Sequence, residues 1–284
     1  MSDPVTLALH PWNQSFCWRD HEGPFRALTA AQVDQFDRDG YVVVDQALDA
    51  AELADVVDEI DAIERQTDEF LRSLDGDRLT ISESGALTFS PHLVSRSARL
   101  RSLSVHPAFL DVCADLIGAD VRLYWDQAVY KKPEKPRRFP WHQDNGYTFV
   151  EPQEYLTLWV ALTDATLANG CPQVAPGIHR SGTLRHEFVD PLGFECFSDR
   201  ADAIAAEVPA GGMVVFSSLT PHLTGPNTTG AVRKAYILQY APDGAAALRG
   251  DPDHGAPLER IPCDVPDRQY PVLRAGVPVA PPTL

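Results

Sequence analysis

The sequence predicts a mainly β protein with helical decorations and a jelly-roll core, and three observations carry this prediction. Helix caps and helical apolar spacing are confined to the first 118 residues, short strand-like runs begin at about residue 121, and no helical pattern separates the later runs. We expect one domain over residues 1–284, with a helical part over about 29–118, a jelly-roll core over about 121–241 and an irregular tail over 242–284.

The helices of the N-terminal part are predicted from their caps. Thr29 and Gln32 have the spacing of a capping box, and Gly40 can end the helix that follows. A second capping pair, Asp49 and Glu52, begins a helix with apolar residues at helical spacing. Between these helices the β-branched run YVVVD (41–45) favours a strand, and a further helix is expected over 106–117, closed by a glycine.

The strands of the core are predicted from apolar runs between turn-rich pieces such as NGYT, LANGCP and GPNTTG. The segment after residue 241 is rich in Pro, Gly and Asp, so we expect it to wrap the surface with little regular structure. The four longest strand-like runs are VRLYWDQAVY (121–130), YLTLWVAL (155–162), GMVVFSS (212–218) and VRKAYILQY (232–240).

The charge composition argues against two classes of binding partner. The formal net charge is −16, with 40 acidic and 24 basic residues, which argues against nucleic acid and anionic membrane surfaces as partners. No apolar run approaches the roughly 18 residues that span a bilayer, and the N-terminus does not have the pattern of a signal peptide. The five cysteines are scattered, which fits a reducing cytoplasm better than a disulfide framework.

The stretch PWHQDNGY (140–147) carries the first functional signal. In a strand, residues i and i+2 point to the same face, so His142 and Asp144 can direct an imidazole and a carboxylate at one point. Metals use such pairs, and so do buried ion pairs. The stretch alone leaves both interpretations open.

A second histidine and an arginine extend the pattern. His222 follows an apolar run at the predicted rim of a sheet, and Arg233 begins the next strand eleven residues later among apolar neighbours. A permanent cation at the start of a core strand needs an anion. Two histidines and one carboxylate form the ligand set of non-haem Fe(II), with positions left for a bidentate 2-oxo acid and O2. The arginine can bind the distal carboxylate of such a co-substrate.

With these residues the sequence resembles the phytanoyl-CoA dioxygenase family of Fe(II)/2-oxoglutarate-dependent oxygenases. The resemblance covers roughly residues 121 to 241. It rests on WHQD (141–144), Trp159, DATLANG (164–170), PGIH (176–179), and His222 with Thr224 and Arg233.

The resemblance implies a double-stranded β-helix, a form of jelly roll, and a role for each matching residue. His142, Asp144 and His222 correspond to the iron ligands. The 2-oxoglutarate pocket corresponds to Arg233, Thr224 and Trp159, and the less constant positions of that pocket to Gln127 and Tyr130. The implied activity is hydroxylation of an unactivated C–H bond of a small organic substrate, with release of succinate and CO2. Desaturation and ring formation after the same hydrogen abstraction stay open. Halogenases of the family lack the metal-binding aspartate, so Asp144 favours hydroxylation.

Two other classes of protein fit the same residues. A non-catalytic small-molecule-binding protein can share the barrel, and a zinc hydrolase can use the same three ligands with a bound water. Arg233 has no purpose in a zinc hydrolase, unless it forms an internal salt bridge with one of the many acids. Trp159 is equally compatible with a place in the core.

Two further segments carry weaker signals. The run KKPEKPRR (131–138) has five cations against one Glu directly before the metal motif, so it can steer an anionic substrate such as a carboxylate or a CoA thioester, or form a solvated loop. The N-terminal residues Trp12, Phe16 and Trp18 are expected to pack against the barrel rather than to cover the site.

Overall fold

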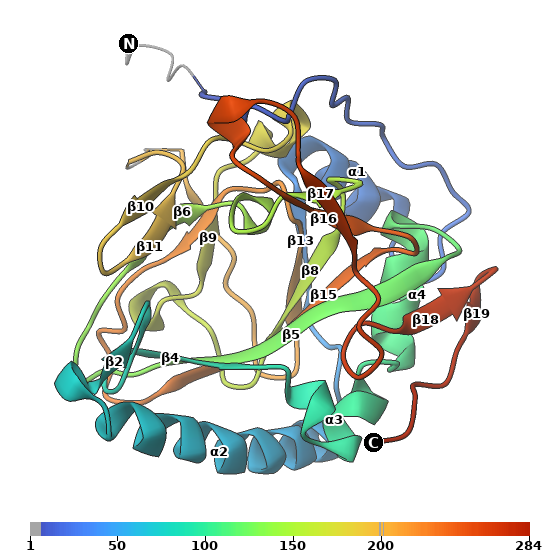
Figure 1. The fold of residues 1–284 in the computed structure, drawn as a ribbon. Coiled ribbons are helices and arrows are strands. Elements are labelled where there is room, and N and C mark those ends of the chain that lie inside the picture. Colours follow the sequence, from blue (N-terminus) through green and yellow to red (C-terminus); the bar gives the residue numbers. More distant parts are fainter. Residues whose placement is uncertain (1–6, 199, 201) are drawn as a thin grey trace.

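The protein is described from a computed structural model, which covers residues 7–198, 200 and 202–284. Its centre is a ten-stranded sheet that faces a four-stranded sheet, and all the strand pairs are antiparallel (Figure 1). This is the mainly β, jelly-roll-type architecture that the sequence predicts. No helix within the described part of the chain has the length and apolar character of a membrane span.

The large sheet runs in the order β1-β13-β8-β15-β5-β4-β3-β2, and β18 and β19 extend it from β5. The strand bounds are β1 Tyr41–Val44, β2 Arg78–Leu79, β3 Ser82–Glu83, β4 Leu87–Pro91, β5 Val121–Lys131, β8 Leu156–Ala161, β13 Met213–Ser217, β15 Arg233–Pro242, β18 Pro271–Arg274 and β19 Val277–Pro278. The four longest predicted strand runs are therefore confirmed as β5, β8, β13 and β15.

The second sheet runs in the order β12-β9-β14-β6 and supplies the other wall of the core. Of two smaller sheets, β10-β11 packs against β6, and β17-β16-β7 lies near the ends of β5 and β15. The bounds of these strands are β6 Phe139–His142, β7 Val150–Glu151, β9 Pro172–Val174, β10 Glu187–Val189, β11 Gly193–Glu195, β12 Ile204–Ala205, β14 His222–Thr224, β16 Ala246–Arg249 and β17 Glu259–Pro262.

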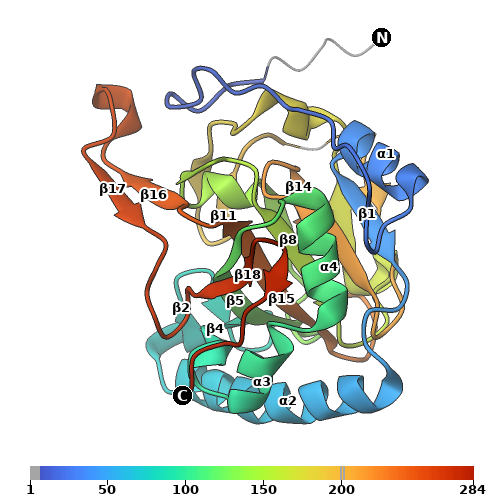
Figure 2. The ribbon, with the colours of Figure 1, turned by 90° about the vertical axis from the view of Figure 1, so that its right-hand side faces the viewer.

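Four helices cover the outer face of the large sheet: α1 Ala30–Asp39, α2 Ala50–Arg72, α3 Ala98–Leu103 and α4 Pro107–Leu116 (Figures 1 and 2). Both predicted capping boxes are present. The Thr29 hydroxyl accepts from the Gln32 amide at 3.3 Å, and the Asp49 carboxylate accepts from the Glu52 amide at 2.9 Å. Gly40 ends α1 in the left-handed region, with φ 84°.

Alternation along the strands separates two apolar clusters. Outward residues such as Leu158 and Tyr236 pack beneath the helices, while inward residues such as Trp159 and Ile237 fill the space between the sheets. The functional side chains described below come from the inward set, so the alternation of each strand decides which residues reach the site.

The C-terminal segment differs from its expectation. Residues 242–284 were expected to be irregular, but they contribute β16, β17, β18 and β19. Leu273 of β18 pairs with Val121 of β5, and Val272 and Leu273 are fully buried. The physical reason is that these apolar side chains complete the core at an edge that only the folded sheet creates.

The N-terminal aromatic residues pack against the body of the protein, as predicted. Trp18 is buried, with its ring 4.4 Å from the ring of His179, and Trp12 packs edge-on against Phe149 at 5.8 Å. His179 itself is buried and contacts the carbonyl oxygen of Asp37 through Nε2 at 3.1 Å. The histidine of the PGIH motif therefore has a structural role.

Candidate functional site

The two histidines meet because their strands pair. His142, the last residue of β6, lies directly opposite His222, the first residue of β14, in the antiparallel register. Their rings are 4.1 Å apart. Asp144 begins the short 3-10 helix Asp144–Gly146, and its Oδ1 lies 3.8 Å from His142 Nε2 and 4.0 Å from His222 Nε2.

These three side chains form the one group in the described part of the chain that can hold a metal ion by this geometry. One ligand atom from each residue lies within 4.8 Å of the others. Two imidazole nitrogens and one carboxylate oxygen match the ligand chemistry of a non-haem Fe(II) site. The donor set fits the ion that the sequence implies.

The protein orients both imidazoles through their other nitrogen. His142 Nδ1 lies 2.8 Å from the carbonyl oxygen of Pro140, and His222 Nδ1 lies 3.0 Å from that of Thr220. Because a carbonyl only accepts, each Nδ1 carries the proton and each Nε2 presents a lone pair to the site. Burial, with a smaller contribution from His222, holds the pKa of His142 well below its usual value, so this ring is neutral at pH 7.

The carboxylate is fixed from the large sheet. The Thr157 hydroxyl on β8 donates to Asp144 Oδ2 at 2.5 Å, and the amide of Gln239 on β15 donates to Thr157 Oγ1 at 3.2 Å. This chain of hydrogen bonds occupies one carboxylate oxygen and leaves Oδ1 directed at the histidines. Sequence reasoning did not single out Thr157 or Gln239, although Thr157 lies two residues before Trp159 on the same strand face.

Gln143, the middle residue of the motif, anchors this segment. Its Nε2 donates to the carbonyl oxygens of Gly182 at 3.0 Å and Leu219 at 2.6 Å, and its Oε1 accepts from the amide of Leu184 at 2.6 Å. The side chain is completely buried, on the opposite side of the backbone from its two neighbours in the motif. All three bonds hold the strand end that carries the ligands, so this glutamine is a positioning residue.

Arg233 lies in the apolar interior, and no described acidic side chain forms an ion pair with it. Its side chain is 1% exposed, its one hydrogen bond within the described residues is a long 3.4 Å contact from an Nη to the carbonyl oxygen of Val129, and its Nε has no partner. The guanidinium lies 5.0 Å from the ring centre of Trp159. Burial lowers the pKa of Arg233 to about 9, which still leaves a cation at pH 7.

A neighbouring buried cation, Lys131, differs from Arg233 in its hydrogen-bond partners. Lys131 pairs with Arg233 in the β5–β15 register and is also fully buried. Its ammonium donates to three carbonyl oxygens, those of Arg137 at 3.0 Å, Thr224 at 3.2 Å and Gly225 at 2.7 Å. Lys131 is therefore satisfied by the protein, whereas the donors of Arg233 have no comparable partners within the described residues.

The remaining predicted co-substrate residues fall into two groups. Thr224 is buried two residues after His222, beside the Lys131–Arg233 pair, and its hydroxyl has no hydrogen bond within the described residues. Gln127 lines the same cavity as His142 and Asp144.

Tyr130 does not join this group. It lies on the opposite face of β5, where its hydroxyl donates to Asp61 of α2 at 2.5 Å. Strand alternation explains the difference, because Gln127 and Tyr130 are three residues apart and therefore face opposite sides.

His142, Asp144 and His222 are called the metal-compatible group below. A cavity of about 460 Å³ opens onto His142 and Asp144 of this group. It lies between β4, β5 and the segment 139–148, and the hairpin of β2 and β3 borders it. Its lining residues are Leu79, Thr80, Ile81, Ser82, Phe89, Pro91, Tyr124, Trp125, Gln127, Phe139, His142, Asp144, Tyr147, Thr148, Tyr155 and Gln239.

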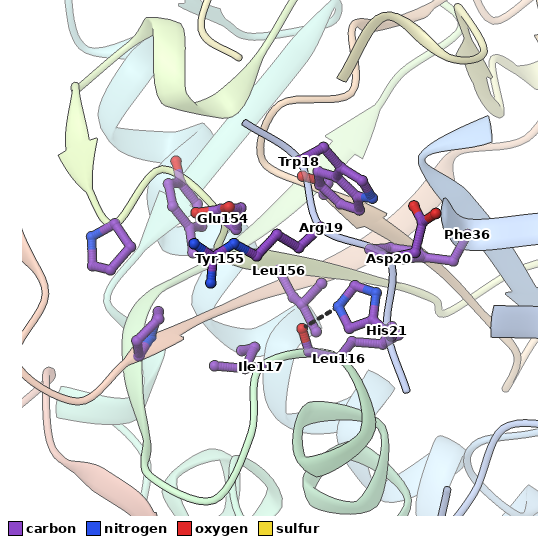
Figure 3. Close-up of a pocket in the computed structure, with 13 residues that line it drawn as sticks. Trp18, Arg19, Asp20, His21, Phe36, Leu116, Ile117, Glu154, Tyr155 and Leu156 are labelled. Atoms are coloured by element: carbon purple, nitrogen blue, oxygen red, sulfur yellow. Dashed lines mark hydrogen bonds between the residues drawn. The ribbon is translucent and has the colours of Figure 1, made fainter. Parts of the chain in front are cut away.

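A second cavity of about 290 Å³ shares Tyr155 with the first and lies against the segment 18–21 (Figure 3). Its histidine, His21, is already engaged at both nitrogens. Nδ1 lies 2.6 Å from Asp37 Oδ1, and Nε2 lies 3.0 Å from the carbonyl oxygen of Leu116. This cavity therefore offers no converging ligand set comparable to that of the first.

The basic run 131–138 does not form the steering patch that the sequence suggested. Lys132 pairs with Glu64 at 2.9 Å and Asp68 at 2.7 Å. Lys135 and Arg137 both pair with Glu83, at 3.0 and 2.8 Å, and Arg138 pairs with Glu195 at 2.7 Å; these acids come from distant parts of the sequence. With Lys131 buried, each of the five cations is already compensated, and none of them lines the cavity. The segment is a loop after Lys131, exposed at residues 134–136, and its ion pairs tie it to the body of the protein.

Comparisons with known proteins agree with this geometry. The family model described as "Phytanoyl-CoA dioxygenase (PhyH)" matches residues 36–235. A probable phytanoyl-CoA dioxygenase of Caenorhabditis elegans is 31% identical over 153 residues, which are 49% of each chain, so the match spans about half the length of that relative.

Two solved structures share the fold. A non-heme α-ketoglutarate-dependent carbocyclase from nogalamycin biosynthesis, SnoK, has a TM-score of 0.62 at 25% identity, covering 84% of this chain and 96% of its own. The epimerase SnoN, in complex with Fe3+, α-ketoglutarate and nogalamycin RO, has a TM-score of 0.62 at 22% identity, covering 82% and 94%. At that identity SnoN supports the fold alone.

Proposed function

The chain belongs to the phytanoyl-CoA dioxygenase family, and from this premise we propose that it is an Fe(II)/2-oxoglutarate-dependent dioxygenase that hydroxylates a small organic molecule. The observation that carries the proposal is the buried Arg233, which has no ion-pair partner among the described residues and one long hydrogen bond. Its donors need an anion, and 2-oxoglutarate supplies a carboxylate of suitable chemistry.

The metal would be held by Nε2 of His142, Nε2 of His222 and Oδ1 of Asp144. Hydrogen bonds orient all three ligand atoms. A backbone carbonyl oxygen accepts from Nδ1 of each histidine, and the Thr157 hydroxyl donates to Oδ2 of Asp144. Iron and 2-oxoglutarate, when bound, supply the activation of O2 and the oxidation of a C–H bond, with release of succinate and CO2.

The co-substrate would be held by Arg233 through its distal carboxylate, with the hydroxyl of Thr224 as a second donor and Trp159 as the wall beside the guanidinium. Gln127, which shares the cavity with His142 and Asp144, is a further candidate contact. Tyr130 is left out of this set, because it donates to Asp61 on the other face of its strand.

The chain's own contribution is orientation and exclusion of water. His142 and His222 are at most 6% exposed, and apolar and aromatic side chains surround the cavity that leads to them. A substrate bound there displaces water from the reacting group and is held at the metal by packing rather than by charge.

Succinate formation tests the proposal. Purified protein with Fe(II), 2-oxoglutarate and O2 should convert 2-oxoglutarate to succinate slowly without substrate and faster with one. His222→Ala should abolish both rates, because the metal loses a ligand. A zinc hydrolase would need no 2-oxoglutarate and a binding protein would turn none over, so no succinate above the level of His222→Ala would refute the proposal.

A further inference from the structure

The lining of the cavity at the metal-compatible group carries information about the substrate. On the side of His142, the rings of Phe139 and Tyr147 stack with an interplanar angle of 16° and meet the imidazole edge-on at 4.7 and 5.4 Å. Phe89 continues this wall, 5.7 Å from Phe139, and Trp125 lies across the same cavity. Aromatic walls of this kind favour flat, apolar ligands.

The described side chains that line the cavity supply no cation other than a metal held at His142 and Asp144. None of its described lining residues is Lys or Arg, and Asp144 is the one acid among them. The tyrosine hydroxyls among the lining residues are uncharged at neutral pH, since a phenol ordinarily titrates near pH 10. An anionic group in this cavity would lose its hydration without gaining a cation from the protein.

Apart from His142, Asp144, the hydroxyls of the serine, threonine and tyrosine residues and the indole of Trp125, the polar lining side chains are the amides of Gln127 and Gln239. Gln239 uses its Nε2 on Thr157, which leaves its Oε1 available, and the Gln127 side chain has no hydrogen bond within the described residues. An amide can both donate and accept, and it carries no charge. Gln127 is already a candidate contact of 2-oxoglutarate, so the amide of Gln239 is the group that suits a hydroxyl, carbonyl or amide on the substrate.

The outer part of the cavity is apolar as well. Leu79 on the hairpin is 51% exposed, and Phe70 of α2, also 51% exposed, lines an adjoining groove of about 320 Å³. The groove has one cation among its lining residues, Arg96, which is exposed and donates to the Gln66 side chain at 3.2 Å. The apolar surface therefore continues from the metal-compatible group to the outside.

We infer that the part of the substrate that reaches His142 and Asp144 is an uncharged, flat and largely apolar ring system, with a hydrogen-bonding group for the amide of Gln239. Apart from the 2-oxoglutarate that the metal site and Arg233 would hold, we expect no carboxylate, phosphate or CoA group, and so none from the substrate, in this cavity. The inference rests on the proposed function insofar as it takes this cavity as the substrate site, and it replaces the anionic substrate suggested by the basic run.

Two probes of matched shape test the inference. We would titrate the protein with 2-naphthamide and with 2-naphthoate by calorimetry at neutral pH, with saturating 2-oxoglutarate so that Arg233 does not capture the carboxylate. The amide should bind at least about tenfold more tightly than the carboxylate. This comparison uses the wild-type protein and depends on no variant.

A pair of phenylalanine variants locates the binding site. Phe89→Ala removes a cavity wall and should weaken 2-naphthamide about tenfold or more, whereas Phe188→Ala, at a 53% exposed position outside the cavity, should leave the affinity unchanged. Equal or tighter binding of 2-naphthoate at a site sensitive to Phe89→Ala would overturn the inference, and so would failure of both probes to bind. Succinate formation is measured without either probe, so the proposed function and this inference can fail separately.

Discussion

Replacing Arg233 by leucine should have two opposite effects, one on co-substrate affinity and one on stability. Within the described residues the guanidinium has one long hydrogen bond and an orphaned Nε, so most of its donors are available to a carboxylate. Two charge-assisted hydrogen bonds contribute about 3 kcal/mol together, and a loss of that size corresponds to roughly a hundredfold weaker binding. Arg233→Leu should therefore raise the Kd of 2-oxoglutarate about a hundredfold.

The same substitution should stabilise the protein when 2-oxoglutarate is absent. The wild-type fold keeps a cation in an apolar interior, and burial lowers the pKa of Arg233 to about 9. A leucine removes this desolvation cost, so the free energy of unfolding should rise by about 1 kcal/mol or more, which is a few degrees in Tm.

Thermal unfolding with and without 2-oxoglutarate measures both effects. The wild type should gain about 2.7 kcal/mol at a ligand concentration a hundredfold above Kd, and Arg233→Leu should gain almost nothing. Lys131→Met is the matched control, because its ammonium is satisfied by three carbonyl oxygens and its loss should destabilise the fold. If Arg233→Leu destabilises the protein as Lys131→Met does and leaves the 2-oxoglutarate shift intact, Arg233 is structural.

Two further pairs of variants test how the protein holds the Asp144 carboxylate and the β2–β3 hairpin in place. Thr157→Val removes the hydroxyl that donates to Asp144 Oδ2, so metal affinity, measured by competition with a chelator, should fall roughly 10- to 100-fold, while Thr157→Ser should retain it. Arg137 donates to the carbonyl oxygen of Ile81 at 2.6 Å and pairs with Glu83, so Arg137→Gln should loosen the β2–β3 hairpin and raise the Kd of 2-naphthamide severalfold. Arg138→Gln, whose partner lies elsewhere, should not; equal effects of both variants would contradict the role of the hairpin.

Much of the fold could be predicted because its signals are local. The capping pair of Thr29 and Gln32, the left-handed Gly40 and the β-branched run of β1 each depend on residues a few positions apart. The ligand motif is local in the same sense, since His142 and Asp144 are two residues apart. Their distance from His222, by contrast, depends on the pairing of β6 with β14, which only the fold establishes.

The sequence-based predictions for the C-terminal segment and for a steering patch in the basic run were wrong because both depend on contacts between distant parts of the chain. The tail became strands because Val272 and Leu273 find a sheet edge at β5, and the cations of 131–138 are compensated by acids such as Glu83 and Glu195. No spacing in the sequence reveals either arrangement. The position of Tyr130 is a different case, because strand alternation alone separates it from Gln127, and the family pattern suggested both.

The most direct test is the visible absorption of the protein after anaerobic addition of Fe(II) and 2-oxoglutarate. If His142, Asp144 and His222 hold the iron and Arg233 holds the 2-oxo acid beside it, the wild type should develop the charge-transfer band of a chelated 2-oxo acid. His142→Ala and His222→Ala should lack the band at every 2-oxoglutarate concentration, and Arg233→Leu should recover it only at about a hundredfold higher concentration. A band of undiminished intensity in both histidine variants, or no band in the folded wild type, would contradict the assignment of this site.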